Sequence, residues 1–334
     1  MDKALWVVRD KITAKAAIDD LMADATTRGI HDVVVQVRGR GDAYYASTLE
    51  PRAESLAPGG WGQGQGPRGQ GPPDAERSAK RQPPNGLDPL GHCVRAGAAV
   101  GVRVHAWGNV FFVWSSADGK LPVSPEHLVH RHPEWLLRPG GARYLDPMGG
   151  KDWEGIYVDP TNDEARDHTL AVFTEIVRTY RVEGFHYDYV RYPQVTYASS
   201  PEDHAAVTAL VRAGAERLRA ARPGVVISAA VFPDPDTARE RVLQRWPEWA
   251  REGWIDLVCP MAYREETAEV TRLLAKARKA APTTRMWGGL MAYPGERERL
   301  RDQVRGAREA GCDGAILFAY DPTQRDLLDV FAAS

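Results

Sequence analysis

Short apolar runs rich in Val, Ile, Leu and aromatic residues recur along the chain, and stretches with the apolar periodicity of amphipathic helices separate them. Branched and aromatic side chains favour a pleated strand, so each short run predicts one strand. Helices are predicted near residues 12–28, 88–100, 163–181 and 202–221, with further charged helical segments between the later strands. The predicted strands are residues 5–9, 32–38, 102–112, 184–192, 225–232, 255–263, 286–293 and 314–321.

The order of these elements predicts the fold class. Strands that alternate with helices are typical of repeated βα units around a parallel sheet. Eight such units in a chain of 334 residues predict α/β architecture in the form of a closed (β/α)8 barrel, the TIM barrel, as a single domain over residues 1–334. An open doubly wound sheet is the alternative, but no G-x-G-x-x-G directly follows the first strand and no P-loop is present.

One segment departs from this pattern. Residues 58–86 are poor in apolar side chains and rich in Gly, Gln and Pro, a composition that buries too little surface to offset the entropy lost on ordering. We therefore predict a mobile insertion, without catalytic residues, in the loop after the second strand. That loop lies on the face where a barrel keeps its active site, so a role in covering the substrate is the alternative.

Charge and cysteine content exclude several classes of function. Lys and Arg number 43 against 45 Asp and Glu, so no basic field exists to concentrate nucleic acid or anionic lipid. Cys93, Cys259 and Cys312 lack metal-ligand spacing and are odd in number, which predicts core thiols rather than disulfides. No apolar run approaches the roughly 20 residues of a membrane span, and the N-terminus lacks the pattern of a signal peptide. We expect a soluble chain, and the sequence leaves open whether an export signal was trimmed ahead of Met1.

The most polar of the predicted strands carries the candidate chemistry. Residues 184–193 read GFHYDYVRYP, and a buried strand seldom accepts an acid, a histidine and an arginine unless they are used. Because side chains alternate along a strand, His186 and Asp188 share one face. With Arg191 nearby, the pKa of Asp188 is expected to be held low, which suits a nucleophile, a base or a charge that stabilises a cation. A buried ion pair between Asp188 and Arg191 that only braces the barrel is the alternative.

Two other strands place polar side chains on what we expect to be the same inner surface. His105, Trp107 and Asn109 alternate along the third strand, and Gln36 and Arg38 along the second. The carboxyl ends of barrel strands meet at one mouth, where barrel enzymes keep their chemistry, so these side chains are expected to converge with the acid of the fourth strand. His105 has a plain alternative as a core histidine bonded to the backbone.

A metal centre built from His105, His186 and Asp188 is a further alternative. These residues do not have the H-x-x-x-H or H-x-H spacing of common ligand pairs. We therefore expect no metal ion and no cofactor.

Aromatic residues gather at the same predicted rim. Flat rings with a polar edge suit the alternating apolar faces and hydroxyl edges of sugars, which favours a carbohydrate groove, although several of the rings are expected to be ordinary core residues. The aromatic residues at strand ends are Tyr44, Tyr45, Trp107, Tyr187, Tyr192, Tyr263, Tyr293 and Tyr320. The residues that we predict to bind the substrate are Arg38, Tyr45, His105, Trp107, Asn109, His186, Arg191, Tyr263, Tyr293 and Tyr320.

Five segments together resemble a known protein family over nearly the whole chain. They are VVVQVRGRGDAYYAS (33–47), GLDPLGHCVRAGAAVGVRVHAWGNV (86–110), HPEW (132–135), YVDPTNDEARDHTLAVFTEIVRTYRVEGFHYDYVRYP (157–193) and DLVCPMAY (256–263). The sequence resembles the bacterial glycosyl hydrolase-like 10 family, also called DUF187. The resemblance implies a TIM-barrel relative of glycosidases, some of which act on cell-wall glycan strands stripped of peptides.

The resemblance also bears on single residues. By position, Asp188 at the end of the fourth strand looks like the acid that related glycosidase barrels use. The chain departs from the family pattern at Glu183, where the family usually has Asp, and in the length of the insertion at residues 58–86. The second departure affects the shape of the groove.

Glycoside hydrolysis normally needs a second carboxyl group. We predict Asp159, although Thr161 and Glu164 behind it form a capping-box pattern that would make Asp159 only a turn residue before a helix. If the substrate carries an acetamido group, its oxygen is an alternative nucleophile that Asp188 would orient. Other candidate acids at strand ends are Asp42, Asp234, Asp236, Glu265, Glu266 and Asp321.

Two functions from different classes follow. The first is a glycoside hydrolase that acts on a bacterial polysaccharide, most simply an amino-sugar glycan such as the glycan strands of peptidoglycan. The second is a catalytically silent barrel that binds glycan, which the lack of an obvious second acid favours. A metal-dependent hydrolase ranks third.

Overall fold

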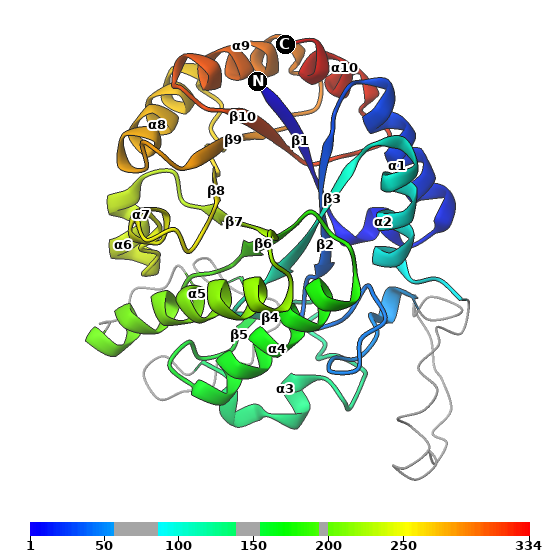
Figure 1. Cartoon of the computed structure of the whole chain (residues 1–334), viewed down its shortest axis with the longest axis vertical. Coiled ribbons are helices and arrows are strands. Elements are labelled where there is room, and N and C mark those ends of the chain that lie inside the picture. Colours follow the sequence, from blue (N-terminus) through cyan, green and yellow to red (C-terminus); the bar gives the residue numbers. More distant parts are fainter. Residues whose placement is uncertain (57–85, 138–153, 194–199) are drawn as a thin grey trace.

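Eight parallel strands close into a barrel in the computed structural model, which describes residues 1–56, 86–137, 154–193 and 200–334 (Figure 1). Each strand pairs with its neighbours in parallel register, and β1 closes the ring against β10. The TIM barrel is therefore confirmed and the open sheet is excluded. In their order around the barrel the strands are β1 (Asp2–Val7), β2 (Asp32–Arg38), β3 (Arg103–Asn109), β6 (Gly184–Asp188), β7 (Val226–Val231), β8 (Leu257–Pro260), β9 (Arg285–Met291) and β10 (Gly314–Phe318).

Helices surround the barrel (Figure 1). Several begin at a polar cap: Asp88 accepts a hydrogen bond from the backbone N–H of Gly91, and Asn162 accepts one from Ala165. The cap expected from Thr161 and Glu164 is thus wrong, because Asn162 takes that place. The helices are α1 (Lys15–Thr27), α2 (Pro89–Val100), α4 (Asp163–Thr179), α5 (Pro201–Ala221), α6 (Pro235–Val242), α7 (Trp246–Arg251), α8 (Thr267–Ala280), α9 (Arg297–Glu309) and α10 (Arg325–Ala333).

Both faces of the barrel strands are apolar, as a sheet covered by helices requires. Inward-facing Trp6, Trp107 and Trp287 fill the barrel together with smaller side chains such as Cys259 and Ile316. The outward-facing Val, Leu and Ile side chains pack beneath the helices in one continuous core. Cys93, Cys259 and Cys312 are all free and buried, which confirms their prediction as core thiols.

An insertion between β3 and α4 departs from the regular βα order. The predicted third strand was too long, because β3 ends at Asn109 and Phe112 begins a separate strand, β4 (Phe112–Trp114), which pairs antiparallel with β5 (Ile156–Tyr157). Short helical turns, α3 (Leu128–Arg131) and η3 (Pro133–Trp135), complete this insertion. Figure 1 shows β4, β5 and α3 beside the barrel strands rather than among them.

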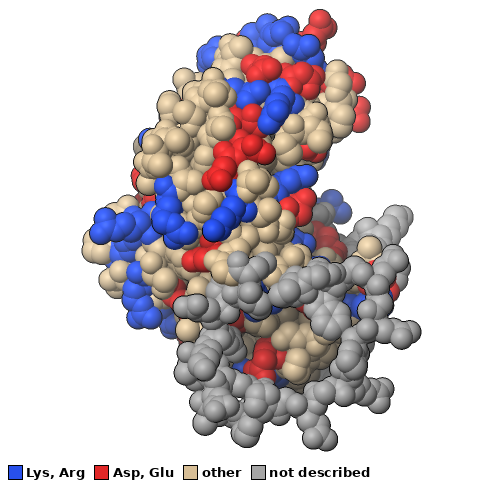
Figure 2. Space-filling model, turned by 90° about the vertical axis from the view of Figure 1, so that its right-hand side faces the viewer, with Lys and Arg blue, Asp and Glu red and all other residues tan. Residues whose placement is uncertain are grey.

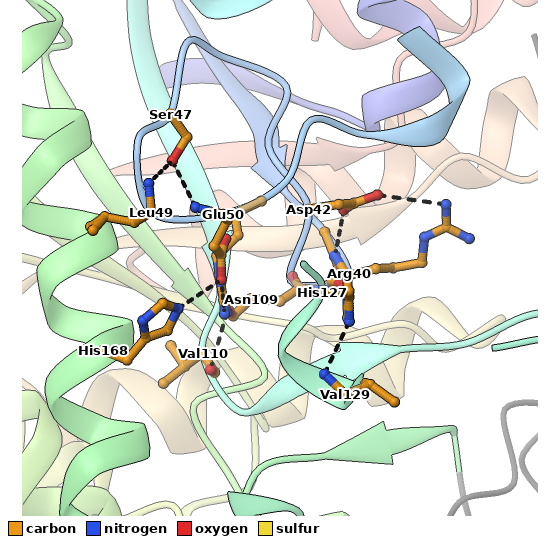
Figure 3. Close-up of polar contacts among 12 residues, drawn as sticks. Arg40, Asp42, Ser47, Leu49, Glu50, Asn109, Val110, His127, Val129 and His168 are labelled. Carbon is orange, nitrogen blue, oxygen red and sulfur yellow. Dashed lines mark hydrogen bonds and ion pairs between the residues drawn. The ribbon is translucent and has the colours of Figure 1, made fainter. Parts of the chain in front are cut away.

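The loop after β2 is held by buried ion pairs and hydrogen bonds. Arg38 places its Nε 3.0 Å and its Nη2 2.6 Å from the carboxylate of Glu50, and His168 of α4 lies 3.6 Å from the same carboxylate. Ser47 accepts hydrogen bonds from Leu49 and Glu50 in the same loop (Figure 3). Burial raises the pKa of Glu50, but Arg38 and His168 outweigh it and bring the pKa to about 2. The insertion predicted at residues 58–86 lies almost wholly outside the described residues.

Charged side chains of both signs are interspersed over the upper part of the face in Figure 2. This mixture agrees with the formal net charge of −2. In the described part of the chain, no helix combines the length and the apolar character that a membrane span needs.

We expect Arg38→Met to lower the free energy of unfolding by about 3–5 kcal/mol, because it leaves the Glu50 carboxylate buried without its counter-ion. Urea denaturation at pH 7 measures this loss. The double variant Arg38→Met/Glu50→Leu removes both charges and should recover most of the stability. An equal loss in the two variants would show that the charge of Glu50 is not the cause.

Candidate active site

Asp188 is the last residue of β6 and lies at the mouth formed by the carboxyl ends of the barrel strands. The backbone N–H of Tyr189 donates to its Oδ1 over 2.7 Å, and the indole of Trp107 is among the groups that lower the pKa of the carboxyl group. Tyr189 adopts a left-handed backbone conformation with φ of 49°, which a non-glycine residue adopts at a cost of about 1 kcal/mol or more. The chain thus leaves β6 in a strained turn that directs a backbone donor at Asp188.

Burial raises the pKa of Asp188 to about 6, and the charge of Glu154 adds to this rise. The hydrogen bonds from Tyr189 and Trp107 and the charge of Arg191 oppose it without reversing it. The low pKa expected from the sequence is therefore wrong. A carboxyl group that titrates near neutrality can carry a proton to a leaving group.

Arg191 forms its ion pair with Glu154 and not with Asp188. Its Nη2 lies 2.7 Å from Glu154 Oε1, and the hydroxyl of Tyr157 donates to Glu154 Oε2 over 2.5 Å. The guanidinium also lies over the ring of Tyr189, 4.7 Å from its centroid. The brace between Asp188 and Arg191 that we considered from the sequence is thus replaced by Arg191–Glu154.

Glu154 is a functional candidate that the sequence analysis missed. It lies in the insertion just before β5, not on a barrel strand, and its side chain is 30% exposed. No motif marks it in the sequence. Two features of its position could have pointed to it. Glu154 lies in an insertion at the active-site face, and it comes three residues before Tyr157, an aromatic residue that it contacts.

His186 lies directly beneath this mouth and is fixed on both sides. The indole N–H of Trp6 donates to its Nε2 over 3.1 Å, so its Nδ1 carries the hydrogen and donates to Ser228 Oγ over 2.8 Å. Burial lowers the pKa of His186 to about 3, so the ring is neutral at physiological pH. His186 therefore supports the floor of the site and is not placed to exchange protons with a ligand.

Aromatic rings gather after β8 and at the end of β10. Tyr263, after β8, stacks on Phe318 with 5.6 Å between centroids and meets Trp6 edge-on at 6.3 Å. Burial raises the pKa of Tyr263, and the charge of Asp188 adds to this rise. Tyr293, after β9, is partly exposed, and the guanidinium of Arg299 lies over its ring.

Four of the side chains predicted to bind substrate are engaged elsewhere. Arg38 forms an ion pair with Glu50, and Tyr45 is buried against Tyr180. His105 donates to Asp32 over 3.1 Å and stands at the level of Gly184, which begins β6, so it lies toward the amino ends of the strands. Tyr320 turns outward and donates to Asp24 of α1 over 2.9 Å. These four predictions are corrected: the residues serve the protein's own packing.

Asn109 lies at the mouth, and its amide is held by contacts within the protein. Its Nδ2 donates to the carbonyl of Gly39 over 2.6 Å, and its Oδ1 accepts from Trp107 over 3.0 Å and from Gln36 over 3.4 Å. Asn109 therefore orients Trp107, and one N–H of its amide is bound within the protein.

Asp159 has the geometry of a turn residue. Its Oδ1 accepts from both the backbone N–H and the hydroxyl of Thr161, over 2.8 and 2.7 Å. Glu154, and not Asp159, is among the groups that chiefly set the pKa of Asp188. Glu154 is therefore the better-placed second carboxyl group.

The described residues contain no group of three or more His, Cys, Asp or Glu side chains placed to hold a metal ion. The three residues considered for such a centre are separated, because His105 turns to Asp32 while His186 bonds Trp6 and Ser228.

Solved structures with this fold include carbohydrate-active enzymes. The α-L-fucosidase isoenzyme 2 of Paenibacillus thiaminolyticus superposes with a TM-score of 0.63 at 15% identity, over 98% of this chain and 48% of that chain. A GH36 α-galactosidase, AgaA, of Geobacillus stearothermophilus superposes with a TM-score of 0.55 at 11% identity, over 98% and 41%. At such low identity the likeness shows the fold.

Curated relatives and a family model match the sequence itself. Glycosyl hydrolase YngK of Bacillus subtilis is 24% identical over 73% of this chain and 48% of its own length, and glycosyl hydrolase DigH of Escherichia coli is 23% identical over 85% and 67%. The chain thus spans about half the length of YngK and about two thirds of DigH. The family model described as Glycosyl hydrolase-like 10 matches residues 71–293, which confirms the family that the motifs resemble. The chain belongs to the Glycosyl hydrolase-like 10 family.

Proposed function

We propose that this protein is a glycoside hydrolase that cleaves a bacterial amino-sugar glycan, such as the glycan strands of peptidoglycan. The family and the barrel support a glycosidase-type function. The observation that carries the proposal is Asp188, a carboxyl group at the barrel mouth whose pKa is raised to about 6, with the partly exposed ring of Tyr263 after β8 at the same end of the barrel. Both features suit a sugar that receives a proton on its glycosidic oxygen.

In this proposal Asp188 is the general acid, because burial keeps its proton at pH values where an ordinary aspartate is ionised. Glu154 supplies the second carboxyl group, and Arg191 holds it toward the mouth through their ion pair. It acts on the other side of the scissile bond, as a base for water or as a nucleophile. Asp159 remains the alternative second acid that the sequence suggested.

The glycan is proposed from the family and from the aromatic floor. Relatives with similar sequence carry the name glycosyl hydrolase, and the partly exposed ring of Tyr263 offers a surface on which a sugar ring packs. An acetamido group on the sugar would offer an oxygen as nucleophile, and Asp188 would then orient it.

A silent glycan-binding barrel is the second candidate. It is favoured by one observation, namely that Glu154 comes from the insertion while Asp188 alone ends a barrel strand among the acids described at this mouth. Binding without cleavage would distinguish this function from hydrolysis.

We expect the protein to release reducing ends from peptidoglycan glycan strands freed of stem peptides, and Asp188→Asn to lower kcat by roughly a hundredfold or more, because a positioned acid contributes about 10²–10⁴. Glu154→Gln should have a similar effect. Asp159→Asn is the matched control and should stay within about threefold of the parent. The assay couples a reducing-end measurement to mass spectrometry of the products.

Full activity of Asp188→Asn would remove Asp188 from the chemistry. A loss in Asp159→Asn with none in Glu154→Gln would restore Asp159 as the second acid. Saturable binding of the strands with no products would support the silent barrel.

The raised pKa of Asp188 also predicts a pH dependence of stability. The fold binds the proton of Asp188 more tightly than the unfolded chain does, so stability is lost as the pH rises from about 4 through about 6. Asp188→Asn removes this penalty and should raise the free energy of unfolding by about 1–3 kcal/mol at pH 8, with little gain at pH 4. Urea denaturation at both pH values measures the effect. Glu183→Gln, which neutralises an exposed acid just before β6, should show no such difference.

A further inference from the structure

Arg9 is a positioned arginine without an acidic partner. It opens the short turn η1 (Arg9–Ile12) directly after β1, and so stands at the same end of the barrel as Asp188. Its Nη1 donates to the side-chain oxygen of Gln36 over 2.8 Å. Its side chain lies across Gly39, where a Cβ atom would stand 2.7 Å from Nη1 and 2.9 Å from Cδ. A glycine therefore makes room for this arginine.

Two other arginines of the site have acidic partners, whereas Arg9 has none among the described residues. Arg38 pairs with Glu50, and Arg191 pairs with Glu154. Over residues 1–56, 86–137, 154–193 and 200–334, no carboxylate lies within ion-pair distance of Arg9, and its recorded side-chain partner is the neutral amide of Gln36. Partly buried cations in proteins are normally paired, because leaving water without a counter-ion costs free energy. A cation held in place by an amide and a glycine is available to a ligand.

A chain of hydrogen bonds leads from Arg9 to Trp107, a residue that influences the acid of the site. Gln36 binds Arg9 through its oxygen and donates its Nε2 to Asn109 Oδ1, which also accepts the indole N–H of Trp107. Trp107 in turn contacts Asp188. Burial raises the pKa of Tyr189 to about 12, and the charge of Arg9 is among those that oppose this rise. Arg9 and Asp188 therefore open onto the same mouth.

We propose that Arg9 forms an anion-binding subsite that receives the carboxylate of an acidic sugar in the glycan. The proposal rests on the proposed function for its place, and it adds the substrate class. The planar guanidinium donates in pairs and matches the two oxygens of a carboxylate. A phosphate monoester, which carries close to two negative charges near neutral pH, would call for a second cation, and Arg38 and Arg191 are already paired with Glu50 and Glu154.

The test compares sugars that differ in a carboxylate. We would measure binding to the whole chain by NMR titration for glucuronic acid against glucose, and for N-acetylmuramic acid against N-acetylglucosamine. The pair that shows the preference identifies whether the carboxylate sits on the ring carbon or on a lactyl ether. At least one acidic sugar should bind roughly ten- to a hundredfold more tightly than its neutral partner, as expected of a charge-assisted paired contact.

Variants assign this preference to Arg9. Arg9→Met should abolish it, and Gly39→Ala should weaken it while the guanidinium is still present, because the added methyl group displaces the arginine. Arg264→Met is the control, since it removes a partly exposed cation after β8 that is already paired with Glu269 at 3.4 Å. That variant should keep the preference. Thermal melts of all variants establish that they are folded.

Equal binding of acidic and neutral sugars by the parent would overturn the subsite, even if the protein cleaves glycan strands. Equal loss of preference in Arg264→Met and Arg9→Met would also overturn it, because bulk charge would then be the cause. A preference that depends on Arg9 in a protein that releases no reducing ends would support the subsite and reject hydrolysis. The experiments can therefore reject the Arg9 subsite and the glycoside hydrolase activity independently of each other.

Discussion

The ion pair between Arg191 and Glu154 governs the electrostatics of the barrel mouth, because it neutralises the cation that Asp188 would otherwise have beside it. Asp188 then keeps a hydrogen-bond donor, the Tyr189 backbone N–H, but no ion-pair partner of its own among the described residues. Desolvation therefore prevails and raises its pKa. Because Arg191 is already paired with Glu154, Asp188 keeps its proton at pH values where an ordinary aspartate is ionised.

The barrel itself was predictable because its physical signal is repeated eight times. Each strand is a short run of branched and aromatic residues, and helices with a charged outer face separate the runs. The ends of strands were less predictable. Asn109 and Phe112 lie in one continuous apolar run, yet the backbone N–H of Val110 turns to the carbonyl of Asp188 and ends β3 there. Alternation along a run carries no information about such a turn.

The site was predictable only in part, because alternation gives the face of a side chain but not its depth in the barrel. His105 and Trp107 share a face, but His105 lies one layer deeper and meets Asp32. Tyr320 lies beyond the end of its strand, where alternation no longer applies, and it turns outward to Asp24. Asp188 was predicted as a candidate because an acid at a strand end is unusual. Glu154 lies in an irregular insertion whose contacts depend on the tertiary fold.

These contacts show which candidate site residues come from the barrel strands and which come from the loops and insertions. The strands supply Asp188 and the rigid floor of Trp6, Trp107 and His186, in which each polar atom is bound by a neighbour. The insertion before α4 supplies Glu154, and the turn after β1 supplies Arg9. Loops on a fixed scaffold change more readily than strands do. Under the two proposals, a change of glycan would therefore need a new residue at the position of Arg9, while Glu154 and the buried environment that sets the pKa of Asp188 stay the same.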